Sequence, residues 1–179
     1  MKADTSAISQ AIGIWSSANR DVVDIEQSLK ARPVDVKSFY KSLSKDFWHF
    51  DLFKYDNKTV EELKSSGNFR LIMDKKIENQ IMSYDLDMKY ILIQERDVKD
   101  LMMVSKQAEK KIADYTQIGF RNFNNDSSYS LLNDDPKLIG EYYNKLLAFN
   151  KLGVYHEYLF RQIQVKAKDL LETIQKEYN

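Results

Sequence analysis

A histidine three residues after a carboxylate is the spacing in this chain that comes closest to metal chemistry. His49 follows Asp46 in this way, which resembles half of a Glu-x-x-His motif. A di-iron helical bundle needs two such motifs and four carboxylates in all. The second of the two histidines, His156, has Gly153 at the equivalent position. We therefore predict no metal site.

Haem ligation is the other chemistry open to a histidine on a helix. His156 lies among apolar residues at helical spacing, and Met88 or Met102 could complete a ligand pair. A core histidine that is hydrogen-bonded or partly exposed accounts for the same pattern without a cofactor. We therefore predict no cofactor-binding residue.

The sequence motifs of common enzyme classes do not occur. There is no G-x-S-x-G, no G-x-x-x-x-G-K and no G-x-G-x-x-G. There is no cysteine either, which excludes thiolate catalysis, disulfides and cysteine-bound zinc. Three carboxylate pairs lack a basic partner, and we interpret them as helix caps and solvated faces: Glu61 with Glu62, Asp97 with Asp100, and Asp134 with Asp135. We predict that the protein is not an enzyme.

Composition narrows the fold and the partners. The chain has 179 residues, 27 basic and 27 acidic side chains, and only 5 Gly and 2 Pro. A nucleic-acid partner favours a basic excess, which is lacking here. No apolar run approaches the roughly 20 residues that span a bilayer. The shortage of turn residues favours a few long helices in one domain, 1–179.

Two long amphipathic helices are predicted, over about 74–119 and 136–178, with Asp74 and Asp135-Pro136 as their starts and Gly119 as a stop. Apolar residues recur at heptad-like spacing along each, interrupted by polar ones. The first stripe is Ile77, Ile81, Tyr84, Met88, Ile91, Glu95, Val98, Met102, Ser105, Glu109 and Ile112. The second is Leu138, Tyr142, Leu146, Phe149, Gly153, His156, Phe160, Ile163, Ala167, Leu170 and Ile174. One connecting loop makes the pair antiparallel.

Two shorter helices are predicted before this pair, over about 5–31 and 34–48. The first has the stripe Ile8, Ala11, Trp15, Ala18, Val22, Ile25 and Leu29. The second is expected to open at Pro33 and to bury Val36, Phe39, Tyr40, Leu43 and Phe47. Four stripes that each need a partner predict an all-α fold, an elongated antiparallel four-helix bundle.

The segment Ser66-Gly67-Asn68 predicts a sharp corner between helices. A connector helix over about 60–66 would begin with a capping box of Thr59 and Glu62 and end where Gly67 takes a left-handed conformation. The apolar residues after it, Phe69, Leu71 and Ile72, are expected to cover the end of the bundle. A plain helix–helix corner and a corner that senses a ligand are both compatible with this pattern.

The same stretch resembles a family of uncharacterised bacterial helical proteins. The resemblance lies in Val60, Leu63, Gly67, Phe69, Leu71-Ile72, Asp74, Ile77, Ile81 and Tyr84, which follow the pattern "eL..sGnlrLI.d..l...i..yy" over about 25 residues. Trp15 and Asn19 loosely match a second segment. The resemblance implies a helical domain on the periplasmic side of a membrane, tethered by an N-terminal helix. It implies no catalytic residue.

Aromatic residues mark the places where binding is most plausible. Tyr142-Tyr143, Tyr155 and Tyr158 are too closely spaced for all of them to face inward, so some could line a groove or a homodimer face. The loop 119–135 is long for a bundle and sets Phe120, Arg121, Phe123 and Tyr129 among amides and hydroxyls, which suits a binding tip. The alternative for the loop is a tolerated insertion. The alternative for the tyrosines is that they belong to the core or to the ordinary surface.

Two functions are compatible with these features. The first is a non-enzymatic, extracytoplasmic sensory or protein-interaction module, which binds a small ligand or a protein and belongs to a membrane-anchored parent. The second is a cytosolic scaffold or oligomerisation domain. A membrane tether requires a hydrophobic helix upstream of Trp15.

Overall fold

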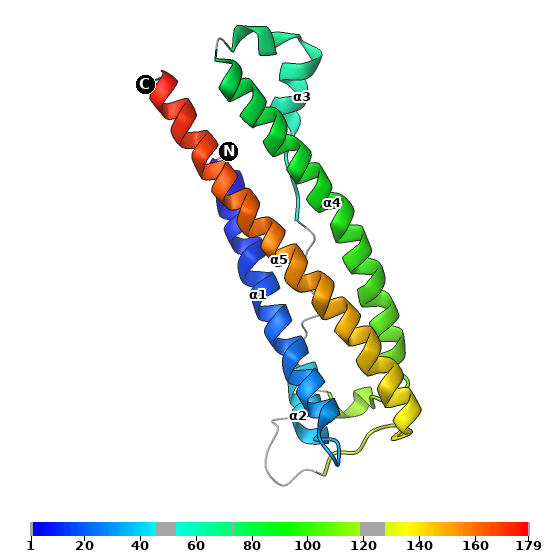
Figure 1. Cartoon of the computed structure of the whole chain (residues 1–179). Coiled ribbons are helices and arrows are strands. Elements are labelled where there is room, and N and C mark those ends of the chain that lie inside the picture. Colours follow the sequence, from blue (N-terminus) through cyan, green and yellow to red (C-terminus); the bar gives the residue numbers. More distant parts are fainter. Residues whose placement is uncertain (1, 46–52, 73, 119–127, 179) are drawn as a thin grey trace. The chain divides into compact units, whose positions relative to one another are not determined.

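The computed structural model describes residues 2–45, 53–72, 74–118 and 128–178, and the side chains from residue 5 onward (Figure 1). These ranges contain helices and no strand, so the predicted all-α class is confirmed. The elements are α1 (Lys2–Lys30), α2 (Val36–Leu43), α3 (Lys58–Ser65), the 3₁₀ helix η1 (Asn68–Leu71), α4 (Lys75–Glu109), the 3₁₀ helix η2 (Tyr115–Gln117) and α5 (Pro136–Tyr178). No helix within the described ranges is long and apolar enough to cross a membrane.

The chain divides into two compact units, and three long helices contribute to both. The first unit comprises 1–13, 52–95 and 156–179, and the second comprises 14–51 and 96–155. Parts of α1, α4 and α5 therefore occur in each unit. The fourth helix is α3 in the first unit and α2 in the second.

The predicted stripes form the buried cores of these units. On α1, all seven residues of the predicted stripe from Ile8 to Leu29 are at most 9% exposed. On α4 and α5 the apolar members between Ile77 and Val98 and between Tyr142 and Leu170 are buried as well. Helical periodicity thus identified the inward faces correctly, because each helix is apolar on one side.

The polar members of the stripes on α4 and α5 are buried as well. Glu95, Ser105 and Glu109 on α4 are each at most 3% exposed, and His156 on α5 is fully buried. These groups need hydrogen-bonding or charged partners inside the protein. They are therefore the first places to look for a site.

The helix predicted over 74–119 ends ten residues early, at Glu109. The chain turns there, and Ile112 and Ala113 follow as fully buried residues outside the helix. Asp114 then caps η2 by accepting a hydrogen bond from the Thr116 amide at 3.0 Å. The predicted stop at Gly119 was wrong, because a side-chain cap and local burial end the helix before any glycine. Gly119 itself lies outside the described residues.

The start of α2 also differs from the prediction. Pro33 lies outside the helix, and Asp35 is the cap, since its carboxylate accepts a hydrogen bond from the Ser38 amide at 3.1 Å. The helix ends at Leu43, and residues 46–48 of the predicted 34–48 helix lie outside the described residues. Phe39, Tyr40 and Leu43 are buried as expected.

The connector helix α3 lacks the predicted capping box. Its cap residue is Asn57, and Thr59 lies inside the helix. Asp56 accepts a hydrogen bond from the Lys58 amide at 3.1 Å. The helix thus starts at Lys58, two residues earlier than it would with Thr59 as its cap.

The corner after α3 is confirmed, but its apolar cover is only partial. Gly67 has φ 67° and ψ 13°, the predicted left-handed conformation. Phe69 and Ile72 are half-buried, whereas Leu71 is 68% exposed. A 3₁₀ helix repeats every three residues, so Phe69 and Ile72 share a face that Leu71 cannot join.

Replacing Gly67 with valine should lower the free energy of unfolding by about 1–2 kcal/mol, because a β-branched residue is strained at positive φ. Asparagine tolerates this conformation better, so Gly67→Asn is the matched control and should cost less. Urea unfolding of both variants measures the difference. Equal stabilities of the valine variant and the wild type would contradict the left-handed corner.

Substitution by alanine is expected to have opposite effects on stability at two glycines of α5. A Cβ at Gly153 would lie 2.6 Å from Oδ1 of Asn19, a side chain that is 7% exposed, whereas a Cβ at Gly140 would meet nothing within 4 Å. Gly140→Ala should therefore stabilise the protein by about 0.5–1 kcal/mol through helix propensity. Gly153→Ala should destabilise it, because α1 and α5 approach closely there. Thermal unfolding tests the pair, and a stabilising Gly153→Ala would show that no such close approach exists.

Candidate functional site

His156 is fully buried in the first unit and lies beside the buried Glu95. Its Nε2 lies 3.7 Å from Oε1 of Glu95, and the same oxygen accepts a hydrogen bond from the Phe53 amide at 3.0 Å. The rings of Phe160 and Phe53 pack beside this pair, with Phe160 edge-on to the imidazole. Met88 is fully buried and Met102 is half-buried. Glu95 and His156 thus hold the extended segment at Phe53 against α4 and α5 in the first unit.

Potential metal ligands do not cluster among the residues that the structure describes. Within these residues, no group of three or more histidine, cysteine, aspartate or glutamate side chains could hold an ion. Asp46 and His49, the half-motif of the sequence, lie outside the described residues.

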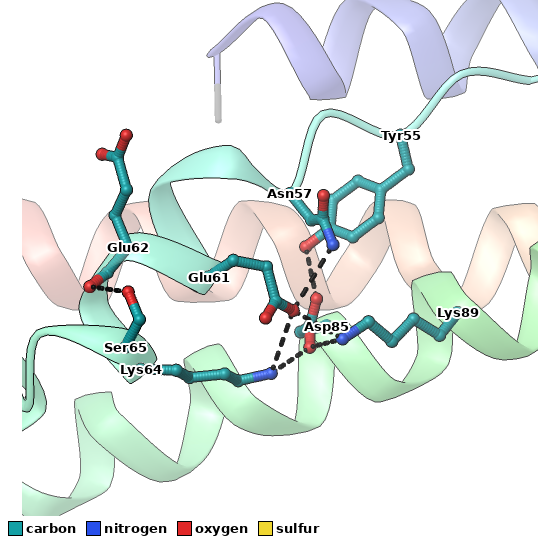
Figure 2. A network of polar contacts seen from close by, with 8 residues as sticks. All are labelled: Tyr55, Asn57, Glu61, Glu62, Lys64, Ser65, Asp85 and Lys89. Carbon is teal, nitrogen blue, oxygen red and sulfur yellow. Dashed lines mark hydrogen bonds and ion pairs between the residues drawn. The ribbon is translucent and has the colours of Figure 1, made fainter.

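A second buried carboxylate, Asp85 on α4, forms the centre of the network in Figure 2. Its side chain is fully buried, and Lys64 and Lys89 lie 2.6 Å and 3.0 Å from its Oδ2. The Tyr55 hydroxyl donates to Oδ1 at 3.1 Å. Glu61 accepts from Lys89 at 2.7 Å and lies 3.6 Å from Lys64, so two acids and two lysines balance. The network attaches α3 and the segment before it to α4.

The pKa shifts in this network follow from the hydrogen bonds between its members. Burial alone would raise the pKa of Asp85, but hydrogen bonds from Lys64, Lys89 and Tyr55 outweigh burial and lower it. Hydrogen bonds to Glu61 and Asp85 raise the pKa of Lys89. A lysine nucleophile or base needs a lowered pKa. Lys89 is therefore shifted in the opposite direction, and the contacts of the cluster attach α3 to α4.

A third buried carboxyl group, Glu109 at the end of α4, accepts hydrogen bonds from two tyrosines. The Tyr142 hydroxyl donates to Oε2 at 2.9 Å, and the Tyr115 hydroxyl donates to Oε1. Burial, followed by the neighbouring Glu109, raises the pKa of Tyr142 and of Tyr115. This cluster joins α4, α5 and η2 in the second unit.

The Tyr40 hydroxyl forms hydrogen bonds with the backbone on both sides of residues 119–127. It donates to the Ser130 carbonyl at 2.9 Å and accepts from the Asp114 amide at 2.9 Å. The Gln117 side chain donates to the carbonyl of Ser130 at 3.0 Å and accepts from its amide at 3.1 Å. Residues 117 and 130 are thus held together. Phe120, Arg121 and Phe123 of the predicted binding tip lie outside the described residues, and Tyr129 is half-buried with its ring 6.0 Å from that of Tyr40.

The closely spaced tyrosines of α5 separate as expected into inward and outward residues. Tyr142 is fully buried, and Tyr143 is half-buried beside Lys30, whose ammonium lies 5.3 Å from the centre of the ring. Tyr155 and Tyr158 are 42% and 53% exposed. A role for either in a homodimer stays a prediction.

The carboxylate pairs of the sequence have different roles. Asp135 is a helix cap as predicted, because it accepts from the Lys137 amide at 2.8 Å, and α5 begins at Pro136. Asp97 and Asp100 are exposed. Glu61 is a correction: it belongs to the Asp85 network and is not simply a solvated side chain. Its partner Lys64 lies three residues away, but its partner Lys89 lies 28 residues away, and no local pattern indicates Lys89.

The described part of the second unit includes surface pockets that were not predicted from the sequence. One, of about 330 Å³, is mostly polar and lies between α1 and α2, where Lys45 pairs with Asp21 and Asp24. The other, of about 280 Å³, lies between the end of α1 and the start of α5, and apolar side chains dominate its lining. Both combine residues distant in sequence.

Comparison with protein-family models, with curated proteins and with solved structures gives no match for this chain. The resemblance to bacterial membrane-anchored helical proteins therefore stays a prediction.

Proposed function

We propose that this chain is a non-enzymatic binding module, with a surface pocket for a small ligand or a surface for a protein partner. One observation supports this most strongly. Within the described ranges, every group with a resolved pKa shift is moved away from neutrality: acids downward, lysines and tyrosines upward. A general acid or base works best with a pKa near the operating pH. We therefore assign Asp85 and Tyr142 a role in stability.

The scaffold that we propose is an elongated antiparallel four-helix bundle. In the first unit α4 and α5 are paired through Asp87 with Lys166 and Glu95 with His156, so they run in opposite directions. In the second unit Glu109 is paired with Tyr142, in the same register. All three contacts fit the antiparallel pairing of α4 with α5 that we propose. Such long helices could transmit a small shift from one end to the other.

The cellular setting of this proposal derives from the sequence resemblance. We place the module outside the cytoplasm, on the periplasmic side, in a parent anchored by an upstream membrane helix. Translation of the DNA immediately before the first codon tests this placement. A parent gene that encodes no hydrophobic helix upstream of Trp15 would remove it, and the binding function would then be cytosolic.

An alternative function, scaffolding by self-association, is favoured by one feature of α4. Met82, Leu86, Tyr90 and Ile93 are 37–62% exposed and recur at spacings of four, four and three. They form a row opposite the buried stripe, so α4 is apolar on two faces. Exposed apolar rows of this kind often mark interfaces.

Light scattering coupled to size exclusion separates the two functions. A monomer of the wild type supports the binding module. A stable dimer that dissociates in the variant Leu86→Glu with Ile93→Glu would favour the scaffold instead. Lys99→Glu with Lys151→Glu is a control on exposed positions of α4 and α5 and should leave the mass unchanged.

A further inference from the structure

The 280 Å³ pocket of the second unit has an apolar lining with charges at its margin. Leu29 is buried at the end of α1, and Ile139 is buried in the first turns of α5. Val34, which is half-buried, lines the pocket between them. Ligand sites commonly combine such a surface with a few polar groups that fix the orientation of the ligand. The volume is just below the usual range of about 300–1,000 Å³, which limits the ligand to a small molecule.

Two cations and one acid complete the lining. Arg32 donates from one guanidinium nitrogen to the carbonyls of Leu29 and Ala31, both at 2.9 Å, which fixes the group at the end of α1. Lys30 lies over the Tyr143 ring, and a hydrogen bond with Tyr143 raises the pKa of Lys30. Asp134 is the acid. The lining therefore carries one net positive charge, which complements a single negative charge on a ligand.

We propose that this pocket binds a small monocarboxylate with a compact hydrocarbon body, its carboxylate against Arg32 and Lys30 and its hydrocarbon against Leu29, Val34 and Ile139. This inference rests on the proposed binding function and names the chemical class of the ligand. The polar pocket between α1 and α2 is the weaker candidate, because its Lys45 and Asp24 already neutralise each other.

Three ligands with the same branched chain test the charge requirement. 4-Methylpentanoate carries a carboxylate, 3-methylbutylamine an ammonium, and leucine both groups. Calorimetric or NMR titration of the wild type should give a dissociation constant for 4-methylpentanoate of about 0.1–1 mM, as expected for so few atoms. The amine should bind at least about tenfold more weakly, because it meets two cations.

Four variants locate the site. Lys30→Gln and Arg32→Gln should each weaken 4-methylpentanoate binding about tenfold, as expected for loss of a charged partner. Lys41→Gln removes an exposed charge of α2 and should leave binding unchanged. Gly140→Leu should abolish binding while the protein stays folded, since Gly140 lines the pocket and an added Cβ there meets nothing within 4 Å. This variant separates loss of the site from loss of the fold.

Three results would overturn the inference. They are undiminished binding to a folded Gly140→Leu variant, equal affinity for the amine and the carboxylate, and tighter binding of leucine, which would assign Asp134 an ammonium partner. A wild type that binds none of the three ligands would also overturn it. A monomer by light scattering would then still support the broader binding function, whereas a dimer through α4 would overturn both.

Discussion

Replacing Lys64 and Lys89 together with methionine should lower the free energy of unfolding at pH 7 by about 3–5 kcal/mol. The reason is that Asp85 is fully buried and accepts charged hydrogen bonds from both lysines. Removing the two cations leaves the buried carboxylate of Asp85 without a positively charged partner. Tyr55 would remain as a donor to Asp85, but one neutral hydroxyl cannot replace two positive charges.

The controls for this prediction separate charge from helix propensity. Asp85→Asn in the wild type should lower the free energy of unfolding by less than the double lysine substitution does. The reason is that the two lysines are 28% and 41% exposed and stay hydrated without Asp85. The same lysine-to-methionine change at the exposed positions Lys99 and Lys151 should stay within about 1 kcal/mol. Urea unfolding of the three variants provides the comparison. If Lys64→Met with Lys89→Met costs no more than the surface pair, Asp85 is not held as described.

Acid should affect the wild type and Asp85→Asn differently. The pKa of Asp85 is lowered in the folded protein, so its contribution to stability is complete above the usual carboxyl pKa of about 4. That contribution is lost as the pH falls from there through the folded pKa. Thermal unfolding between pH 7 and pH 2 should therefore show a difference between the two proteins that narrows as the pH falls. A difference that widens in acid would contradict the direction of the shift.

Tyr142→Phe should lower the free energy of unfolding by about 2–3 kcal/mol, the second largest effect expected. The hydroxyl of Tyr142 and the carboxyl of Glu109 are both buried, and the substitution leaves Oε2 of Glu109 without that donor. Tyr115→Phe removes the other hydrogen bond but affects a side chain that is 42% exposed. Its cost should be smaller, since water can reach the vacated position.

The exposed Tyr90 offers the matched control, because Tyr90→Phe changes the same single atom outside any described hydrogen bond. It should stay within about 0.5 kcal/mol of the wild type. Urea unfolding of the three tyrosine variants should give the order 142, 115, 90 from the largest loss to the smallest. A Tyr142→Phe variant as stable as Tyr90→Phe would show that the buried hydrogen bond contributes nothing.

The helices and their inward faces were predictable because they depend on local chemistry. Periodicity placed Ile77 and Leu170 in the core, Asp135 before Pro136 placed the start of α5, and Gly67 placed the corner. Each of these signals extends over one or a few turns of helix. The ends that were wrong, at Glu109 and at Pro33, depend on competing caps or on burial by residues outside the helix.

The polar clusters and the pockets could not be predicted, because their members are far apart in the sequence. Glu109 and Tyr142 are separated by 33 residues, and Phe53 and Glu95 by 42. A single polar residue in an apolar stripe indicates burial but does not identify its partner. The signal that was available was the polar substitution itself: Glu95, Glu109 and His156 interrupt their stripes, and all three are bound to other buried groups.

We propose that α4 and α5 are antiparallel partners in a helical bundle, and pulsed electron paramagnetic resonance tests this proposal directly. Because the chain has no cysteine, Ser83→Cys with Lys151→Cys places two spin labels at exposed sites and nowhere else. Ser83 lies in the first unit and Lys151 in the second. In the proposed bundle, Lys151 lies opposite a position of α4 about 16 residues after Ser83, and each residue adds 1.5 Å along the helix. The proposal therefore predicts one narrow distribution of label distances at about 25–30 Å. A broad distribution, or one centred far from this value, would contradict the single bundle.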